Sequence, residues 1–297
     1  MPLLAFAGLA LAVFIFTGGF ASARLYMEAS GRPADVVALR YGISGLLFVS
    51  FVYRARHRIT ANPGWWRAAA IALGGGAPFG ICVFISVSGA PFTHGGGIVP
   101  GLAMVLGTLL AWRLSGETLD RRRLSGIGLT VAGLAWLLIP ELTRSNVHWW
   151  GEVAFFGAGI CWACFTIMLR GFKVGQLQGA ALAAFFSIPY LVVYFALLEP
   201  ALLEVAWQDT LIHGFYQGVM FNMVAMGIYA WSVAHVGAAG AVAAMPLMPA
   251  FAVAMERAIF GRAAHDMALP AIGLMAIGIA LAAGMMRKNR QQPQRIA

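Results

Sequence analysis

Charged residues are scarce in this sequence. Asp, Glu, Lys and Arg make up 10% of its 297 residues, whereas 61% of the residues are hydrophobic and the mean hydropathy is +0.80. A water-soluble domain of this length needs a polar exterior, which this composition does not supply. The shortage of charge therefore excludes an ordinary soluble protein and places most side chains in lipid or inside a helix bundle.

The chain also has little that supports redox, metal or nucleotide chemistry. Its three cysteines lie in apolar segments, and the C-x-x-C pair Cys161 and Cys164 has no second ligand pair, so helix packing explains it best. We find no phosphate-binding loop and no nucleophile–base arrangement in the sequence. These absences argue against an ATP-driven pump and against an enzyme, and we expect neither a cofactor nor a metal ion.

Ten apolar segments fill the chain, each close to the length of about 20 residues that crosses a bilayer as a helix. They cover residues 3–23, 34–53, 66–88, 93–114, 124–139, 150–169, 179–198, 212–232, 237–260 and 267–286. The connections between them are short, so they leave no room for a soluble domain. The sequence predicts an all-α, polytopic membrane protein with ten transmembrane helices.

The first segment allows a second interpretation. Residues 3–16 followed by Ala21, Ser22 and Ala23 resemble the apolar core and cleavage site of a secretory signal. No basic stretch precedes them, and cleavage would leave one half with an unpaired set of helices. We therefore expect the first helix to be retained.

The net charge of +9 follows membrane orientation better than it follows nucleic-acid binding. If the N-terminus is cytoplasmic, most Lys and Arg residues fall on the cytoplasmic side and most acidic residues fall on the other, as the positive-inside rule requires. We expect a multi-pass protein of a bacterial inner membrane with both termini in the cytoplasm. Its expected partners are the lipid bilayer and a small-molecule substrate, not nucleic acid, and we expect a monomer or a weak homo-oligomer.

The second half of the chain repeats the first. Identical residues recur at the same spacing in the fifth and tenth segments: Gly116, Leu124, Ile127, Gly128, Leu129, Gly133 and Ala135 match Gly261, Leu269, Ile272, Gly273, Leu274, Gly278 and Ala280. Because each half holds five crossings, the second copy enters the membrane from the opposite side. We predict two inverted five-helix repeats, 1–143 and 144–286, around a central cavity, with a basic cytoplasmic tail at 287–297.

Several motifs resemble the EamA-type repeat of the drug/metabolite transporter superfamily. They are residues 92–97 (FTHGGG) with Pro100, 116–117 (GE) and 124–129 (LSGIGL) in the first half, and 216–218 (YQG) and 234–249 with Gly261 in the second. Arg262 departs from the pattern, since the family has glutamate there. Members export amino acids, including aromatic ones, other small metabolites and toxic organic compounds. The resemblance implies a ten-helix exporter whose helices one, three, four, six, eight and nine surround a central cavity.

Polar and aromatic side chains within the segments are the candidates for solute contact, because a polar group in hydrocarbon is costly unless it faces protein or water. They are Thr17, Phe79, His94, Trp162, Thr166, Gln217, Asn222 and Tyr229. An interhelical hydrogen bond explains Asn222 equally well, core packing explains Trp162 equally well, and an ordinary interfacial position remains open for His94.

Proline and glycine interrupt the third, fourth and ninth segments. A proline frees a backbone carbonyl, which lipid tolerates where a neighbour or cavity water satisfies that group. The candidates for helix-break or gating positions are Pro78, Gly97, Pro100, Pro246 and Pro249. Close helix packing is the alternative for the glycine.

Arg40 lies about two turns inside the second segment. Snorkelling to the outer surface, or pairing with Asp35, explains this position better than direct solute binding. No Asp or Glu lies at mid-depth in any predicted segment, which argues against carboxylate-based proton or sodium coupling. We therefore expect uniport, with His94 as the titratable candidate for any coupling.

The sequence as a whole predicts an exporter of small metabolites that works by alternating access, with aromatic or other hydrophobic amino acids as the first candidate substrates. The alternatives are an efflux permease for toxic organic compounds and, from a different class, a membrane-embedded enzyme or a structural subunit. A nucleotide-sugar-like carrier is disfavoured because basic residues do not cluster at mid-depth. A structural subunit has no need for inverted halves.

Overall fold

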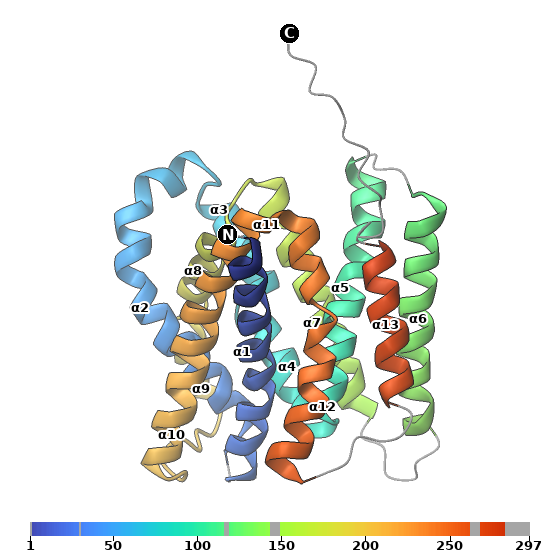
Figure 1. Cartoon of the computed structure of the whole chain (residues 1–297). Helices are drawn as coiled ribbons and strands as arrows, with labels where there is room; N and C mark the ends of the chain where they lie inside the picture. Colours follow the sequence, from blue (N-terminus) through green and yellow to red (C-terminus); the bar gives the residue numbers. More distant parts are fainter. Residues whose placement is uncertain (1, 30, 116–118, 143–148, 262–267, 283–297) are drawn as a thin grey trace.

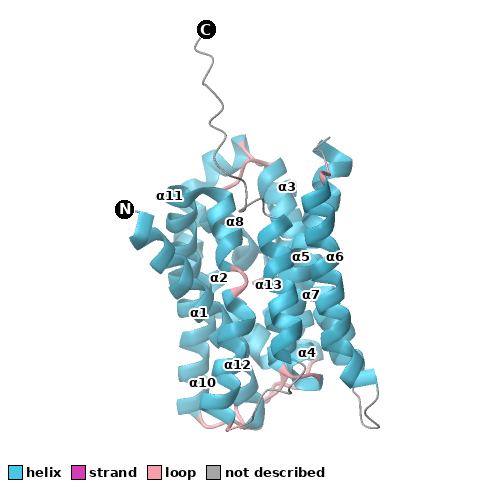
Figure 2. Ribbon diagram, turned by 45° about the vertical axis from the view of Figure 1, so that its right-hand side comes forward, coloured by secondary structure: helices cyan, strands magenta, loops and turns pink. Residues whose placement is uncertain are grey.

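The protein is a bundle of helices whose axes run roughly in one direction, with most loops at the two ends (Figures 1 and 2). The computed structural model describes residues 2–29, 31–115, 119–142, 149–261 and 268–282. Every regular element within these ranges is helical, which confirms the all-α prediction.

Fourteen consecutive elements build the bundle. The first half contains α1 (Pro2–Glu28), α2 (Pro33–Ala61), α3 (Trp65–Gly75), α4 (Ala77–Gly89), α5 (Phe92–Ser115) and α6 (Arg121–Leu142). The second half contains α7 (Trp149–Gly171), α8 (Gln176–Phe186), α9 (Tyr190–Leu197), α10 (Trp207–Gly214), the π-helix η1 (Phe215–Ala225), α11 (Met226–Ala244), α12 (Leu247–Phe260) and α13 (Ala268–Ala282).

These elements join into ten helical rods over the described residues. One broken rod comprises α3 and α4, and another comprises α8 and α9, whereas α10 and η1 continue directly into α11. Gly237 ends that rod with a positive φ of 76°, and the rest of α11 with α12 forms the ninth. Eight of the described helices are long and apolar enough to cross a membrane, and Leu269–Ala282 is a shorter apolar helix. The ten-helix, polytopic prediction is confirmed.

The two halves run through the bundle in opposite directions. Helix α1 begins at the upper end of Figure 1 and α6 ends at the lower end, whereas α7 begins at the lower end and α13 ends at the upper end. Five crossings separate the start of each half from its end. The start of α1 and the end of α13 therefore lie at the same end of the bundle.

Packing across the halves follows a matching scheme. Helices α4 and α5 pack against α7, while α11 and α12 pack against α1. Since α1 and α7 open the two halves, each half receives the first helix of the other. The last helices, α6 and α13, pack against each other along their length.

The α6–α13 contact depends on glycine. A Cβ atom on Gly278 would lie 2.6 Å from the backbone nitrogen of Thr130, and one on Gly133 would lie 2.8 Å from the carbonyl oxygen of Ala271. A side chain at either position would push the two backbones apart. Gly133 and Gly278 are a matched pair in the sequence repeat, so the repeat carries the residues that bring its two copies together.

Large apolar side chains cover the outside of the bundle. Leu46, Leu73, Phe195 and Leu269 are all exposed, which lipid tolerates because its chains are as apolar as leucine. Buried polar side chains, including Thr17, Arg40, His94 and Gln217, lie inside the bundle.

Candidate functional site

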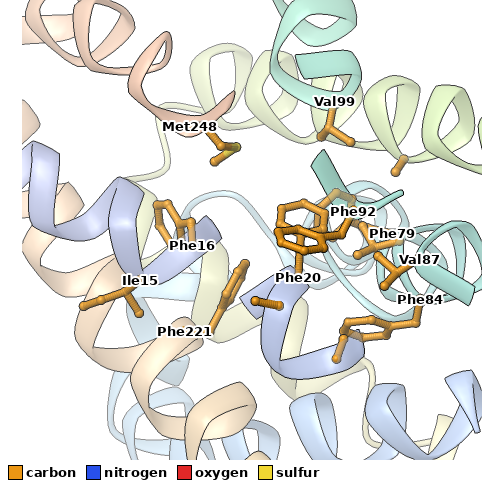
Figure 3. Packing of buried hydrophobic residues seen from close by; sticks show 14 of the residues in the cluster. Ile15, Phe16, Phe20, Phe79, Phe84, Val87, Phe92, Val99, Phe221 and Met248 are labelled. Carbon is orange, nitrogen blue, oxygen red and sulfur yellow. The ribbon is translucent and has the colours of Figure 1, made fainter. Parts of the chain in front are cut away.

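Phenylalanine rings line the interior where the halves meet. Figure 3 shows Phe16 and Phe20 of α1, Phe92 of α5 and Phe221 of η1 converging from separate helices. The Phe16 and Phe221 ring centroids lie 5.0 Å apart. An aromatic interior of this kind favours solutes with an apolar body.

Arg40 of α2 reaches this interior. Its Nε donates a hydrogen bond of 2.9 Å to the Oε1 atom of Gln217, and its Nη2 donates a second one to the same oxygen. The guanidinium carbon lies 3.8 Å from the ring centroid of Phe221 and 4.5 Å from that of Phe84. The charge is thus held by an amide oxygen and by the electron-rich faces of two rings.

Gln217 is held in place from its other side. Its Nε2 donates to the carbonyl oxygen of Gly19 in α1 at 2.7 Å, which directs its oxygen toward Arg40. A Cβ on Gly19 would lie 3.3 Å from the Nη2 of Arg40 and 2.6 Å from the ring of Phe221. The missing side chain therefore lets α1 approach the π-helix η1, an element often found at functional sites.

The position of Arg40 corrects the sequence interpretation. Its side chain is 1% exposed, so it does not snorkel to the surface. Asp35 accepts instead from the hydroxyl group of Tyr194, from the backbone N–H of Ala201 at 3.2 Å and from that of Arg32 at 2.7 Å. Hydropathy alone does not reveal this, because the partner of Arg40 comes from the other half of the chain.

Asn222 forms an interhelical hydrogen bond next to this site. Its Nδ2 donates to the Oγ of Ser44 at 2.9 Å, and the Oγ of Ser44 donates to the carbonyl oxygen of Arg40 at 2.6 Å. Both hydrogen-bonded pairs therefore join α2 to η1. The bond through Ser44 was not predicted, because a serine in an apolar helix has no distinguishing signal.

His94 and Glu152 form a second buried polar pair. The Nδ1 of His94 in α5 lies 2.6 Å from the Oε1 of Glu152 in α7, and both residues are buried. The Oε2 atom of Glu152 is also buried and has no hydrogen-bond partner among the described residues. The partner of His94 was not predicted, since Glu152 lies near the start of its helix.

Buried carboxylates are thus present in the bundle, near the helix ends. Asp35 is the third residue of α2, Glu152 is the fourth of α7, and Glu256 lies in the last turns of α12; all three are buried. The sequence argument about ion coupling considered mid-depth positions alone, so it left these three carboxylates out. Carboxylate chemistry is available to this bundle at its ends.

The break between α3 and α4 is closed by polar groups from other helices. The backbone N–H of Ala77 donates to the Oγ of Ser187 at 2.8 Å, and the hydroxyl of Tyr41 donates to the carbonyl oxygen of Gly75 at 3.1 Å. Ser187 itself lies at the break between α8 and α9. Pro78 follows in the first turn of α4, where its missing N–H is tolerated.

The remaining solute-contact candidates have local partners. The hydroxyls of Thr17 and Thr166 donate to carbonyl oxygens of their own helices. Trp162 is half-buried, with its ring centroid 5.3 Å from that of Phe79, and Tyr229 lies 5.9 Å from Phe16. Both aromatic pairs, Trp162–Phe79 and Tyr229–Phe16, join the two halves of the chain.

The helix-break candidates differ among themselves. Helix α5 runs through Pro100 without interruption, and a Cβ on Gly97 would lie 2.6 Å from the Cε of Met275 in α13. Pro246 caps the start of α12, and Pro249 lies in its first turn. The structure therefore places breaks at Pro78 and Pro246, and close packing at Gly97.

Comparison with known proteins finds a matching family. Residues 3–139, which cover α1 to most of α6, match the EamA-like transporter family. The first half of the chain is thus similar to EamA-like transporters. This match supports the superfamily that the sequence motifs indicate, and it agrees with the multi-pass bundle of long apolar helices.

A solved crystal structure shares the fold of this chain. The two chains are 18% identical and superpose with a TM-score of 0.61 over 94% of this chain and 97% of the other. No curated protein matches the sequence.

Proposed function

We propose that this chain is an EamA-like transporter that exports small amphipathic metabolites by alternating access, with aromatic and other hydrophobic amino acids as its first candidate substrates. The observation that carries the proposal is an aromatic interior with a few fixed polar groups, such as the pairs Arg40–Gln217 and His94–Glu152. Such an interior suits a solute with an apolar side chain and a polar backbone better than a highly charged one.

Alternating access is supported by where the polar contacts lie. Arg40–Gln217, Ser44–Asn222, His94–Glu152 and Ala77–Ser187 each join residues 1–143 to residues 144–286. Two five-helix units that rock against each other would break such contacts on one side and make them on the other. We propose that these two units are inverted repeats, in keeping with their opposite directions in Figure 1.

The distribution of charge supports cytoplasmic termini in a bacterial inner membrane. Arg56 and Arg58 near the end of α2, and Arg121 and Arg122 at the start of α6, belong to the same end of the bundle as the start of α1 (Figure 1). Glu28, at the end of α1, belongs to the opposite end. By the positive-inside rule the basic end faces the cytoplasm.

Flux measurements test the proposed function. Purified protein in liposomes should move labelled phenylalanine faster than empty vesicles do, with the same rate constant whether or not a pH gradient is imposed if transport is uniport. Trp162→Ala should lower this flux about ten-fold by removing a stacking surface, whereas Trp66→Ala, on the exposed bundle surface, should keep it.

Three results would contradict parts of the proposed function. Absence of flux above empty vesicles for every hydrophobic amino acid removes the proposed substrate class. A strong dependence of flux on the imposed pH gradient removes uniport and directs attention to the buried pair His94–Glu152. Equal losses in Trp162→Ala and Trp66→Ala would remove the interior position of the solute.

A further inference from the structure

A side chain with a permanent charge lies inside the bundle and has no ionic partner among the described residues. Arg40 is fully buried, and a guanidinium stays protonated in proteins. Ion pairs among the residues that the structure describes include Arg24–Glu28 and Arg32–Glu199, and His94 lies against Glu152. Arg40 belongs to none of them, and a buried charge is costly unless something opposes it.

The neighbours of Arg40 are neutral. Gln217 accepts through a single amide oxygen, and the rings of Phe84 and Phe221 present their faces. Tyr41, the next residue along α2, is its other polar neighbour. Neutral acceptors and ring faces lower the free energy of the buried cation without cancelling its charge.

We propose that Arg40, held by Gln217, is the recognition site for the carboxylate group of the transported solute; this rests on the proposed function. A guanidinium has five N–H groups in a planar fork, more than one amide oxygen can accept. A carboxylate fits that fork and supplies the missing negative charge. The carboxylate of the solute would thus be the counter-ion of Arg40.

The surroundings are organised for this role. Four elements converge on the guanidinium: α2 carries it, η1 supplies Gln217, α4 supplies Phe84, and α1 approaches through Gly19. The hydrogen bond from Gln217 to the carbonyl oxygen of Gly19 fixes the amide, so the remaining donors of Arg40 are held in one orientation. Pre-ordering of this kind favours tight recognition of a small group.

A single cation favours a carboxylate over a phosphate. Arg24 and Arg32, the neighbouring cations on or next to the first two helices, are engaged with Glu28 and Glu199 toward the helix ends. A phosphate group carries up to two negative charges and usually calls for several charged donors. One guanidinium is enough for the single charge of a carboxylate.

Flux of two matched solutes tests the proposal. At about pH 6 phenylalanine and phenylalaninamide both carry a protonated ammonium group and the same ring, so they differ in the carboxylate, which is an amide in the second solute. Wild-type protein in liposomes should move phenylalanine about ten-fold faster or more, and Arg40→Met should remove that preference while changing the amide flux by no more than about two-fold. The matched control is Arg54→Met, an exposed position on the same helix, which should keep the preference.

A second variant keeps the proposal testable if Arg40→Met fails to fold. Gln217→Glu places a carboxylate where the amide now touches Arg40, so the protein then supplies its own counter-ion. We expect phenylalanine flux to fall about ten-fold or more, because the internal carboxylate competes with the solute. The new ion pair with Arg40 should offset the lost hydrogen bond to the carbonyl oxygen of Gly19, so the thermal midpoint should stay close to that of the wild type. A purely structural arginine predicts unchanged flux in this variant.

Three results would overturn the assignment. These are equal losses of phenylalanine and phenylalaninamide flux in folded Arg40→Met, unchanged phenylalanine flux in Gln217→Glu, and Arg40-dependent competition by inorganic phosphate but not by acetate. If the wild type moves both solutes at equal rates, this inference fails while the proposed function stands. If it moves neither, nor any other hydrophobic amino acid, the proposed function fails as well.

Discussion

Two buried polar pairs in the same bundle are built in opposite ways. His94 and Glu152 join α5 to α7, and the Nδ1 atom of His94 lies 2.6 Å from the Oε1 atom of Glu152, so an acidic side chain faces a basic one. Arg40 and Gln217 join α2 to η1 and include a fixed cation with a neutral partner. Both pairs are buried and both connect the two halves.

Charge balance separates a polar pair that stabilises the fold from one that can bind a solute. Burial of a polar group does not distinguish the pairs, and neither does their interhelical position. Charge balance distinguishes them. A pair with an acid and a base stabilises the fold without a ligand, whereas a cation with a neutral partner is stabilised further when an anionic group binds. We therefore expect mutations at the first pair to act on stability and mutations at the second to act on selectivity.

The largest loss of stability is expected at the uncharged α6–α13 contact. The losses at the two polar pairs can be compared with it. Gly278→Leu should cost about 3 kcal/mol or more, because the new Cβ would meet the backbone of Thr130 and Gly126. The free energy of unfolding in mixed micelles measures this. Gly273→Leu is the control on the same helix, since a Cβ there meets nothing within 4 Å, and equal losses in the two variants would contradict the packing argument.

Breaking the balanced pair should have an intermediate effect. Glu152→Ala should cost about 2 kcal/mol, since it leaves the buried ring nitrogen of His94 without its acceptor. Glu152→Gln should cost less, because an amide oxygen can still accept from Nδ1. The same unfolding assay applies, and Glu199→Ala, in the exposed pair with Arg32, should change stability by under about 1 kcal/mol. A Glu152→Ala protein as stable as the wild type would show that this pair does not hold α5 to α7.

The smallest effect is expected beside the unbalanced pair. Asn222→Ala should cost about 1 kcal/mol, the value of one neutral hydrogen bond, and Ser44→Ala should cost a similar amount. The double variant should cost less than the sum of the two, because the same bond is lost in each. The preference for phenylalanine over its amide should persist in Asn222→Ala; its disappearance would show that charge at Arg40 does not by itself set the selectivity.

Much of the fold was predictable because its causes are local. A bilayer imposes a minimum length on an apolar helix, so the ten segments, including the one that begins at Gly237, can be located from hydropathy alone. Five crossings per half imply opposite directions for the halves. The interruptions at Pro78 and Pro246 follow from the chemistry of proline.

The partners inside the bundle were not predictable. Arg40 and Gln217 lie 177 residues apart in the chain, and His94 and Glu152 lie 58 apart. Hydropathy places each residue in a helix and leaves open which helices meet and which way each side chain points. Asp35, five residues from Arg40, was therefore the natural candidate partner from sequence and proved to be wrong.

Apolar segment length, repeat spacing and the EamA-like motifs are properties of the chain alone, and they were enough to predict a ten-helix membrane transporter. Tertiary structure decided that the arginine of the second helix turns inward to meet a glutamine of the eighth. The physical reason is that a charge in a membrane protein must find its compensation in three dimensions, through whichever helices pack around it.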